Sequence, residues 1–464
     1  MDPALHRIIE ALGPDAQLAV VGGTVRDRLL GRDGGDWDLA TALLPGAVLE
    51  RARAAGVRAI PTGLQHGTVT LMEGGAAFEI TTFRGDGDYL DGRRPESVTL
   101  GVSLEEDLAR RDFTINAMAL PAAAMALPDW RDRLVDPHGG RRDLEARLIR
   151  AVGDPLQRFQ EDGLRCLRAC RFQSQLGFAI DPATLAAIPR RLEVAAKVAV
   201  ERVFTELTKL LQGADPGHGL ATLEATGLLD LWLPELRPMV GCLQNRHHRY
   251  PVWEHVLEVA RRTPPEADLR WAALLHDAGK PASRTVDAKG ETHFYGHEAL
   301  SVTLAGTILT RLRASHALIR QVTALVRHHG THPGPSWGDP ACRRFLRQLL
   351  EDGLPLERWG WFRLADQTGK GFPVEPLQAA HDAMVARLET LAARRPPLAI
   401  QALALDGKAL MALAKRPGGP WLGQLQQFLL EAVLEDPARN QPGPLGELAA
   451  GWLVAVSQPG NEFK

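Results

Sequence analysis

The feature that most constrains the fold is a short apolar run that ends in a pair of glycines. Residues 18–21 are apolar, Gly22 and Gly23 follow, and a segment with a helical pattern comes next. Glycine adopts backbone conformations that are closed to other residues, so the pair allows a tight turn from a strand into a helix. Backbone N–H groups at such a turn suit a phosphate group. The sequence therefore predicts a phosphate-binding strand–turn–helix unit near the N-terminus.

Two aspartates follow this unit at the spacing of one strand face. Asp36 and Asp38 are two residues apart, and side chains at positions i and i+2 of a strand point to the same side. Such a pair repels unless a cation lies between the carboxylates, and hard oxygen ligands favour Mg²⁺. Taken alone, the glycine pair is also compatible with an ordinary turn, and the aspartates with a solvated strand end. Their occurrence together, in this order, favours a site for phosphate and metal.

Glu79 is the candidate for a third carboxylate. It lies in an alternating run, residues 77–83, that reads as a strand, so a neighbouring strand would bring it beside the aspartates. Three carboxylates and two metal ions suffice for in-line nucleotidyl transfer. A solvated charge on an edge strand is the alternative.

Length and composition describe a globular protein of several domains. The 464 residues exceed one ordinary hydrophobic core, and 45% of them are hydrophobic. No apolar run approaches the roughly 20 residues needed to cross a bilayer. No secretory signal is visible, and the 4 cysteines include no C-x-x-C pair, so we expect a cytoplasmic protein without a membrane partner. A net charge of −2 argues against bulk coating of nucleic acid but permits a local basic groove.

The pattern of elements divides the chain into an α/β head and a long helical remainder. Strand-like runs occur only before Asp154, after which the pattern is helical. We expect an α+β fold with a head at residues 1–150, a helical neck at 151–230, a helical body at 231–375 and a helical tail at 376–464. Residues 84–95, rich in glycine and charge, are predicted to form a mobile loop.

Asp162 and Arg165 are candidates for reading a nucleobase. They are three residues apart in a predicted helix over 155–176, so both side chains project from one side. A carboxylate beside a guanidinium offers an acceptor beside a donor, which complements the pairing edges of C and A and not those of G and U. Arg168 and Arg171 would continue a row of basic side chains that contacts the phosphate backbone of a nucleic acid. An ordinary intrahelical ion pair is the alternative.

A second polar pair precedes this run. Asp112 and Asn116 are four residues apart, which places them on one face of a predicted helix. Asp112 could instead cap that helix and pair with Arg110 or Arg111. Both interpretations stay open at the level of sequence.

Histidine and aspartate residues in the helical body form a candidate metal site. His276 and Asp277 are adjacent, and His255 and Asp366 lie on other predicted helices. Imidazole and carboxylate ligands suit a divalent transition metal or Mg²⁺. Further candidates, for a second ion, are His297, His328 and His329.

Five motifs together resemble the bacterial class II CCA-adding tRNA nucleotidyltransferase and poly(A) polymerase family, which belongs to the DNA polymerase β superfamily. The motifs are Gly22-Gly23-x-x-Arg26-Asp27, Asp36-x-Asp38, Arg110-Arg111-Asp112-Phe113-Thr114-Ile115-Asn116-Ala117, Asp136-Pro137-x-Gly139-Gly140-x-x-Asp143-Leu144 and Glu161-Asp162-x-x-Arg165. The resemblance covers roughly residues 18–212. Residues 245–370 resemble an HD-type phosphohydrolase domain. The implied fold is a polymerase β-like head, an all-helical neck, an HD-type body and a tail.

The resemblance implies a role for each motif residue. Asp36 and Asp38, with Glu79 as a third carboxylate, would hold catalytic Mg²⁺. The nucleotide would be bound by a longer set, in which Glu161 fixes Arg165: Gly22, Gly23, Arg26, Arg111, Asp112, Asn116, Glu161, Asp162, Arg165 and Arg168. In the HD part, a divalent metal would be held by His255, His276, Asp277 and Asp366.

The activity implied first is addition of C and A, from CTP and ATP, to the 3′ end of tRNA without a nucleic-acid template. Addition of A alone and poly(A) synthesis are alternatives that share the head, whereas the retained 84–95 loop disfavours addition of C alone. An alternative of another class is a metal-dependent HD phosphohydrolase whose head binds RNA. Modification of a protein is disfavoured by the Asp162–Arg165 run.

Overall fold

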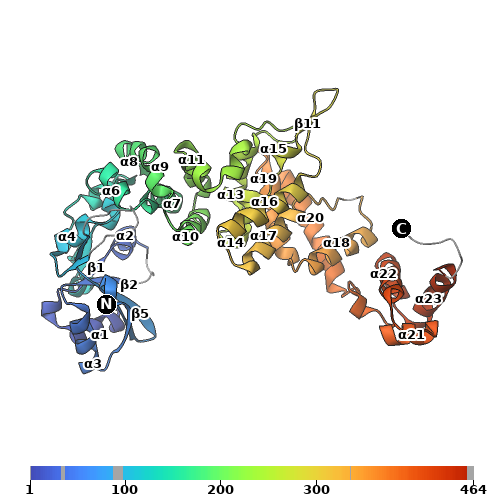
Figure 1. The fold of residues 1–464 in the computed structure, drawn as a ribbon, viewed down its shortest axis with the longest axis horizontal. Helices are drawn as coiled ribbons and strands as arrows, with labels where there is room; N and C mark the ends of the chain where they lie inside the picture. The colour runs from blue at the N-terminus through green and yellow to red at the C-terminus, as the bar shows by residue number, and fades with distance from the viewer. Residues whose placement is uncertain (1, 33–36, 87–97, 335, 457–464) are drawn as a thin grey trace. The chain divides into compact units, whose positions relative to one another are not determined.

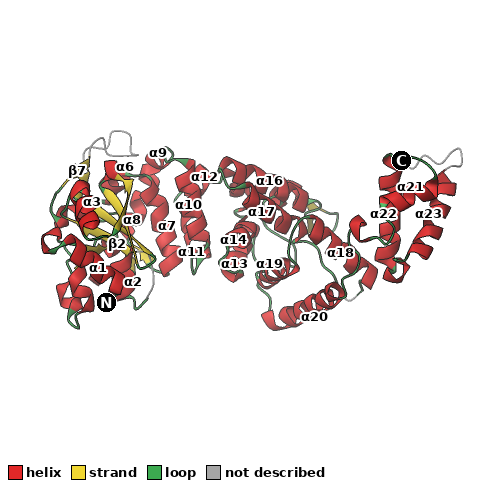
Figure 2. Cartoon of the chain, turned by 90° about the horizontal axis from the view of Figure 1, so that it is seen from below, coloured by secondary structure: helices red, strands yellow, loops and turns green. Residues whose placement is uncertain are grey.

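The computed structural model describes residues 2–32, 37–86, 98–334 and 336–456. The chain divides into two compact units, Met1–Arg237 and Pro238–Lys464, and each is described by itself (Figure 1). Strands of the main sheet lie in the first unit, and the second is almost wholly helical (Figure 2). The fold is thus mixed α+β, as predicted. Within the described residues, no helix is long and apolar enough to cross a bilayer.

A six-stranded sheet forms the head, in the order β3-β4-β5-β2-β1-β8. Its strands are β1 Ala19–Val21, β2 Trp37–Thr41, β3 Arg58–Gly63, β4 Thr68–Glu73, β5 Ala76–Thr82 and β8 Ala119–Pro121. β1 is buried along its whole length, which explains its uninterrupted apolar sequence. β2 and β5 run parallel, while the other neighbours are antiparallel.

Short helices accompany the sheet. They are α1 Pro3–Leu12, α2 Gly23–Leu29, α3 Pro45–Ala54, α4 Leu104–Ala109 and α5 Gly140–Glu145. α1 begins where Asp2 accepts a hydrogen bond from the Ala4 N–H, and it buries Leu5, Ile8 and Leu12, which recur at the spacing of one helical face.

Two expectations about strands were wrong. Arg84–Asp86, expected in a mobile loop, forms β6, which pairs with β7 at Val98–Leu100, and residues 87–95 of that loop lie outside the described residues. Strands also occur beyond Asp154, because β10 Ala179–Ile180 pairs with β9 Leu148–Ile149, and β11 Thr285–Val286 pairs with β12 Thr292–His293. Two-residue strands carry no alternation, so no periodic pattern revealed them.

The helical neck continues the first unit. Its helices are α6 Pro155–Glu161, α7 Leu164–Leu176, α8 Pro182–Ala187, α9 Leu192–Ala195, α10 Val200–Leu211, α11 Pro216–Ala225 and α12 Leu228–Trp232. The single helix predicted over 155–176 is two helices, separated at Asp162 and Gly163. α7 is the central helix of the neck: Cys166, Leu167 and Cys170 are fully buried in it.

The second unit begins with the helical body. Its helices are α13 Val252–Arg262, α14 Ala267–Leu275, α15 Lys280–Ser283, α16 His297–Arg311, α17 His316–His328, α18 Asp339–Glu351, α19 Leu356–Thr368 and α20 Val374–Ala393. Large side chains fill its core, among them Trp271, Phe345, Trp359 and Phe362.

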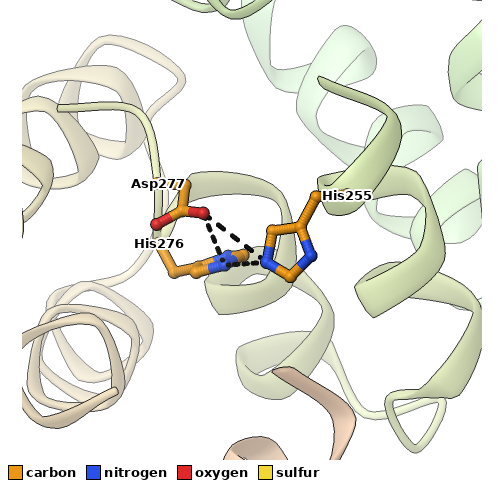
Figure 3. A group of neighbouring side chains, drawn as sticks. All are labelled: His255, His276 and Asp277. Carbon is orange, nitrogen blue, oxygen red and sulfur yellow. Dashed lines mark hydrogen bonds and ion pairs between the residues drawn. The ribbon is translucent and has the colours of Figure 1, made fainter. Parts of the chain in front are cut away.

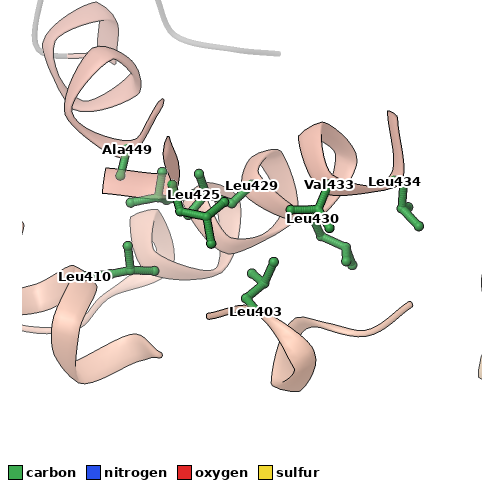
Figure 4. Close-up of a cluster of buried hydrophobic side chains, with 9 residues drawn as sticks. Leu403, Leu410, Leu425, Leu429, Leu430, Val433, Leu434 and Ala449 are labelled. Atoms are coloured by element: carbon green, nitrogen blue, oxygen red, sulfur yellow. The ribbon is translucent and has the colours of Figure 1, made fainter. Parts of the chain in front are cut away.

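The tail has a separate apolar core (Figure 4). Its helices are α21 Gly407–Ala414, α22 Pro420–Glu435 and α23 Pro442–Val456. Leu410, Leu425, Leu429 and Ala449 meet in this core from all three helices. Arg343 of α18 donates hydrogen bonds to the last carbonyls of α22, which joins the tail to the body.

Candidate functional site

The first unit contains a polar pocket of about 460 Å³ that gathers most of the predicted nucleotide-binding residues. Its lining consists of Gly22, Gly23, Arg26, Asp38, Arg110, Arg111, Asp112, Asn116, Asp162, Leu164, Arg165, Arg168, Arg171, Phe172, Gln175 and Arg202. Of the predicted set, Glu161 and Glu79 are not in the lining, and Asp36 lies outside the described residues.

The glycine turn forms one wall of the pocket. Gly22 precedes α2 and has φ +67°, a conformation that L-residues with a side chain rarely adopt. A Cβ atom at this position would lie 2.9 Å from Arg111 Nη1. The Gly22 N–H itself donates to the Met118 carbonyl, so the expectation that both glycine amides face an anion was wrong for Gly22. The close approach of Arg111 brings a guanidinium to the turn.

Asp38 and Glu79 lie side by side on adjacent strands. They are directly opposite each other where β2 runs parallel to β5, which confirms the predicted proximity. Both are exposed, and Asp38 reaches the pocket beside Gly22. Exposed carboxylates on adjacent strands, next to a basic pocket, supply the oxygen ligands that Mg²⁺ prefers.

Asp112 is the centre of a buried network at the pocket. Its carboxylate accepts hydrogen bonds from Arg168 at 2.7 Å and from the Asn116 amide at 3.1 Å, and Arg26 in turn donates to Asn116 at 2.7 Å. Burial opposes ionisation of Asp112, but the Arg168 charge and the Asn116 hydrogen bond outweigh it and hold the pKa of Asp112 well below its usual value. The network fixes the orientation of three charged side chains.

Asp112 and Asn116, predicted to share one helical face, are in contact, but the predicted helix is wrong. Phe113 is extended and only Thr114–Asn116 form a short 3₁₀ helix. Asp112 also does not pair with Arg110 or Arg111, because both of these contact Asp107.

Asp162 and Arg165 both line the pocket, but different hydrogen-bond partners hold them there. Asp162 lies in the gap between α6 and α7, where it accepts hydrogen bonds from the Leu164 N–H at 3.0 Å and from Arg202 at 2.7 Å. Arg165 donates to Glu161 at 2.5 Å and to the Arg110 carbonyl at 2.8 Å. The intrahelical ion pair is therefore wrong, and each residue is held by its own partner.

Gly163 explains why the chain breaks between the two helices. A Cβ atom here would lie 2.6 Å from the backbone of Ala195 at the end of α9, so only glycine permits this packing. The break turns Asp162 away from the helical position that sequence spacing predicted and toward α10.

Two further pocket residues, Arg202 and Phe172, were not predicted as site residues from the sequence. Arg202 is 40 residues from its partner Asp162, a separation at which no spacing rule applies. The Phe172 ring lies 3.9 Å from the Arg171 guanidinium and 5.2 Å from that of Arg26. An aromatic residue on an apolar helix face gives no signal of such a role.

The second unit assembles the predicted histidine–aspartate cluster. His276 and Asp277 directly follow α14, and His255 of α13 faces them (Figure 3). His276 Nε2 lies 3.3 Å from His255 Nε2 and 3.2 Å from Asp277 Oδ2, while Asp366 Oδ1 of α19 lies 3.2 Å from His255 Nε2. All four side chains are buried.

A second group shares Asp277. His297 and His329 approach its Oδ1 atom at 3.6 and 3.5 Å, and their Nε2 atoms are 3.2 Å apart. His328, also predicted for a second ion, was wrong, since its Nε2 lies 2.7 Å from Asp352 and it does not belong to either group.

The hydrogen bonds of the four histidines fit a metal. In each, Nδ1 faces a backbone carbonyl, which can only accept a hydrogen bond, so Nδ1 carries a proton, and in the neutral form of the ring Nε2 would present a lone pair. The contacts are His255 to Gly369 at 3.2 Å, His276 to Ala273 at 3.0 Å, His297 to Phe294 at 2.8 Å and His329 to Val326 at 2.6 Å. The Nε2 atoms of His255 and His276 lie 3.3 Å apart, and those of His297 and His329 lie 3.2 Å apart. Lone pairs that face each other at such distances suit a shared cation.

Known proteins share these features. Residues 18–150 match the model of the poly A polymerase head domain, residues 177–239 that of a probable RNA- and SrmB-binding site of polymerase A, and residues 246–358 that of the HD domain.

Curated relatives match over nearly the whole chain. A CCA-adding enzyme of Geobacillus thermodenitrificans is 36% identical over 94% of this chain and 93% of its own length. An A-adding tRNA nucleotidyltransferase of Deinococcus radiodurans is 37% identical over 89% and 91%. The crystal structure of the Bacillus stearothermophilus CCA-adding enzyme in complex with CTP superposes with a TM-score of 0.70 at 29% identity, covering 98% of each chain. The chain therefore belongs to the bacterial CCA-adding tRNA nucleotidyltransferase and poly(A) polymerase family and carries an HD domain.

Proposed function

We propose that this protein adds C and A ribonucleotides, from CTP and ATP, to the 3′ end of tRNA without a nucleic-acid template. The observation that carries the proposal is the pocket that joins Asp38 and the glycine turn to Asp162 and Arg165. Relatives named CCA-adding enzyme, and a solved relative in complex with CTP, support it. Addition of A alone is the nearest alternative, because one relative bears that name.

The reacting end of the pocket is assigned to the carboxylates. Asp36, Asp38 and Glu79 would hold Mg²⁺, which when bound activates the attacking 3′-hydroxyl and neutralises charge on the triphosphate. The glycine turn and Arg26 would bind the triphosphate, and Arg111 and Asp112 would face the ribose. The ordered Arg26–Asn116–Asp112–Arg168 network orients these groups before the nucleotide arrives.

The base-reading end is assigned to Asp162 and Arg165. A carboxylate oxygen has two lone pairs, so Asp162 can accept from Arg202 and still accept from the amino group of C or A. Arg165, anchored by Glu161, would donate to the adjacent ring nitrogen. G and U present the reverse order of donor and acceptor, which would leave both side chains unpaired.

Incorporation of labelled nucleotide tests the proposal. Purified protein is incubated with Mg²⁺ and labelled CTP or ATP on two tRNA transcripts, one lacking all three terminal nucleotides and one ending in CC. Full CCA addition requires CTP incorporation on the first transcript and ATP incorporation on the second. ATP incorporation on the second alone identifies addition of A only, and absence of both overturns the proposal.

The HD cluster supports an auxiliary activity, metal-dependent hydrolysis of a phosphate ester. His255, His276, Asp277 and Asp366 would hold a divalent metal, and their two imidazoles favour a transition metal over Mg²⁺. Hydrolysis of a nucleotide or cyclic phosphate in the presence of Mn²⁺, Ni²⁺ or Mg²⁺ measures it. The activity should disappear in His276→Ala/Asp277→Ala while nucleotide addition persists.

We propose that the domains of this protein are the head at residues 1–150, the neck at 151–230, the HD body at 231–375 and the tail at 376–464. We also propose that the protein is cytoplasmic. Expression of residues 1–237, the first compact unit, tests whether head and neck fold and bind CTP without the body.

A further inference from the structure

A cavity of about 550 Å³ lies in the second unit and is lined mainly by apolar side chains. Leu377, Met384 and Leu388 of α20 contribute to it, together with Pro333 of the segment before α18. Its volume falls within the range of about 300–1,000 Å³ that small-molecule sites occupy. None of the histidines or aspartates of the two metal groups lines it.

One buried cation lines this cavity with unused hydrogen-bond donors. Arg363 of α19 is only 8% exposed, and its Nε and Nη1 atoms have no hydrogen-bond acceptor within the described part of the chain. Nη1 lies 3.5 Å from Asp366 Oδ2, a distance that gives attraction without a hydrogen bond. Buried guanidinium donors are normally satisfied, so Arg363 is a buried cation beside the cavity with hydrogen-bonding capacity that the described residues do not use.

The other polar groups around the cavity leave its net character cationic. Arg387 is already paired with Asp339 at 2.8 Å. Burial, reinforced by the Arg363 charge, lowers the pKa of His332 to about 4, so this ring is neutral at pH 7. Among the described residues, no carboxylate lines the cavity.

We propose that this cavity binds a small organic anion with an apolar body. The acidic head, a carboxylate, sulfonate or phosphate, accepts hydrogen bonds from Arg363, and the body packs against Leu377 and Met384. The site is separate from the metal groups but adjoins them, because Gln367, which also lines the cavity, donates to Asp366 at 2.9 Å. Binding of such an anion does not depend on the function proposed for the nucleotide pocket or for the HD cluster.

A fluorescent pair of probes tests the proposal on the full-length protein. 8-Anilinonaphthalene-1-sulfonate has an apolar body and one anionic head, and N-phenyl-1-naphthylamine has the same body without the charge. We expect the sulfonate to bind at one saturable site. Arg363→Met should weaken its binding at least tenfold while changing the affinity for the neutral probe less than twofold.

Two further variants complete the test. Met384→Trp places a larger side chain in the cavity and retains the cation, so it should abolish binding of both probes. Arg320→Met removes an exposed arginine of α17 outside the cavity and should change neither. Circular dichroism and thermal unfolding establish that each variant is folded.

Two results overturn the proposal. One is a sulfonate affinity that Arg363→Met leaves unchanged. The other is probe binding that persists in Met384→Trp, since the probes then bind elsewhere.

Discussion

Arg202 of α10 donates a hydrogen bond to Asp162 Oδ2 at 2.7 Å, although 40 residues separate them in the sequence. The contact orients the carboxylate that is proposed to read the base. Arg202 is thus expected to act as a positioning residue for Asp162, the residue proposed to contact the nucleotide.

Replacing Arg202 should impair selectivity more than turnover. In Arg202→Met, Asp162 loses one restraint, so the ratio of kcat/KM for CTP over UTP should fall by about tenfold, near 1.4 kcal/mol. Single-nucleotide incorporation with CTP and UTP measures this ratio. Arg190→Met, which alters an exposed arginine outside the pocket, is the control. An unchanged ratio in Arg202→Met would show that Asp162 is positioned without it.

Asp38 and Glu79 should contribute unequally to catalysis. Asp38 reaches the nucleotide pocket and Glu79 does not, so Asp38→Asn should lower kcat by roughly 10³-fold and Glu79→Gln by a smaller factor. Both side chains are exposed, and folding should be unaffected. Single-turnover addition measures the rates, with Glu73→Gln at the end of β4 as the control. Equal losses would contradict the assignment.

Gly22→Ala should weaken nucleotide binding without unfolding the head. The new methyl group would lie 2.9 Å from Arg111 Nη1, at a φ of +67° that costs alanine about 1 kcal/mol. CTP affinity, measured by titration calorimetry, should fall severalfold. Gly31→Ala is the matched control, because its φ is also positive, at +69°, but no atom lies near the added carbon. Equal effects of the two variants would show that backbone strain alone explains the loss.

The buried Asp112 should make the head sensitive to acid. Its pKa is lower in the folded protein than in the unfolded chain, so its stabilising contribution is present above the ordinary aspartate pKa near 4 and is lost as the pH falls below it. Asp112→Asn should cost about 1–3 kcal/mol at pH 7, and the difference from wild type should shrink toward pH 3. Hydrogen-exchange protection of residues 112–118 measures it. A difference that is constant with pH would contradict the prediction.

The neighbouring histidines His328 and His329 should respond differently to substitution. His329→Gln removes an Nε2 atom from the group around Asp277 and should weaken Mn²⁺ binding about tenfold or more. His328→Gln is the matched control, since His328 pairs with Asp352 and lies outside both groups. Titration calorimetry on the apoprotein measures both affinities. Loss of Mn²⁺ binding in His328→Gln alone would contradict the proposed ligand set.

Local spacing was sufficient for several parts of the site. The apolar run before Gly22 predicted a strand and a turn, and the alternation around Glu79 predicted a strand that could lie beside Asp38. These features depend on backbone preference and on which face is apolar, and both are properties of neighbouring residues. The motif set also indicated the family, which the comparisons confirm.

Spacing failed where packing overrides the local pattern. Asp162 was predicted to share a helix with Arg165, but the close contact between Gly163 and Ala195 ends α6 and redirects Asp162 toward α10. His328 and His329 were indistinguishable by spacing. Adjacent positions on a helix point about 100° apart, so only the placement of α17 decides which ring meets Asp277.

The order of residues thus predicted the turn and the main strands, because these follow from preferences of residues within a few positions. The motif set, also local in sequence, indicated the family and most of the pocket-lining residues. The pairing of Glu161 with Arg165 was implied by the resemblance, but the tertiary structure alone decided the partners of Asp162 and Asp112. Arg202 holds Asp162 and Arg168 holds Asp112, and both geometries exist only once the neck helices have packed around α7.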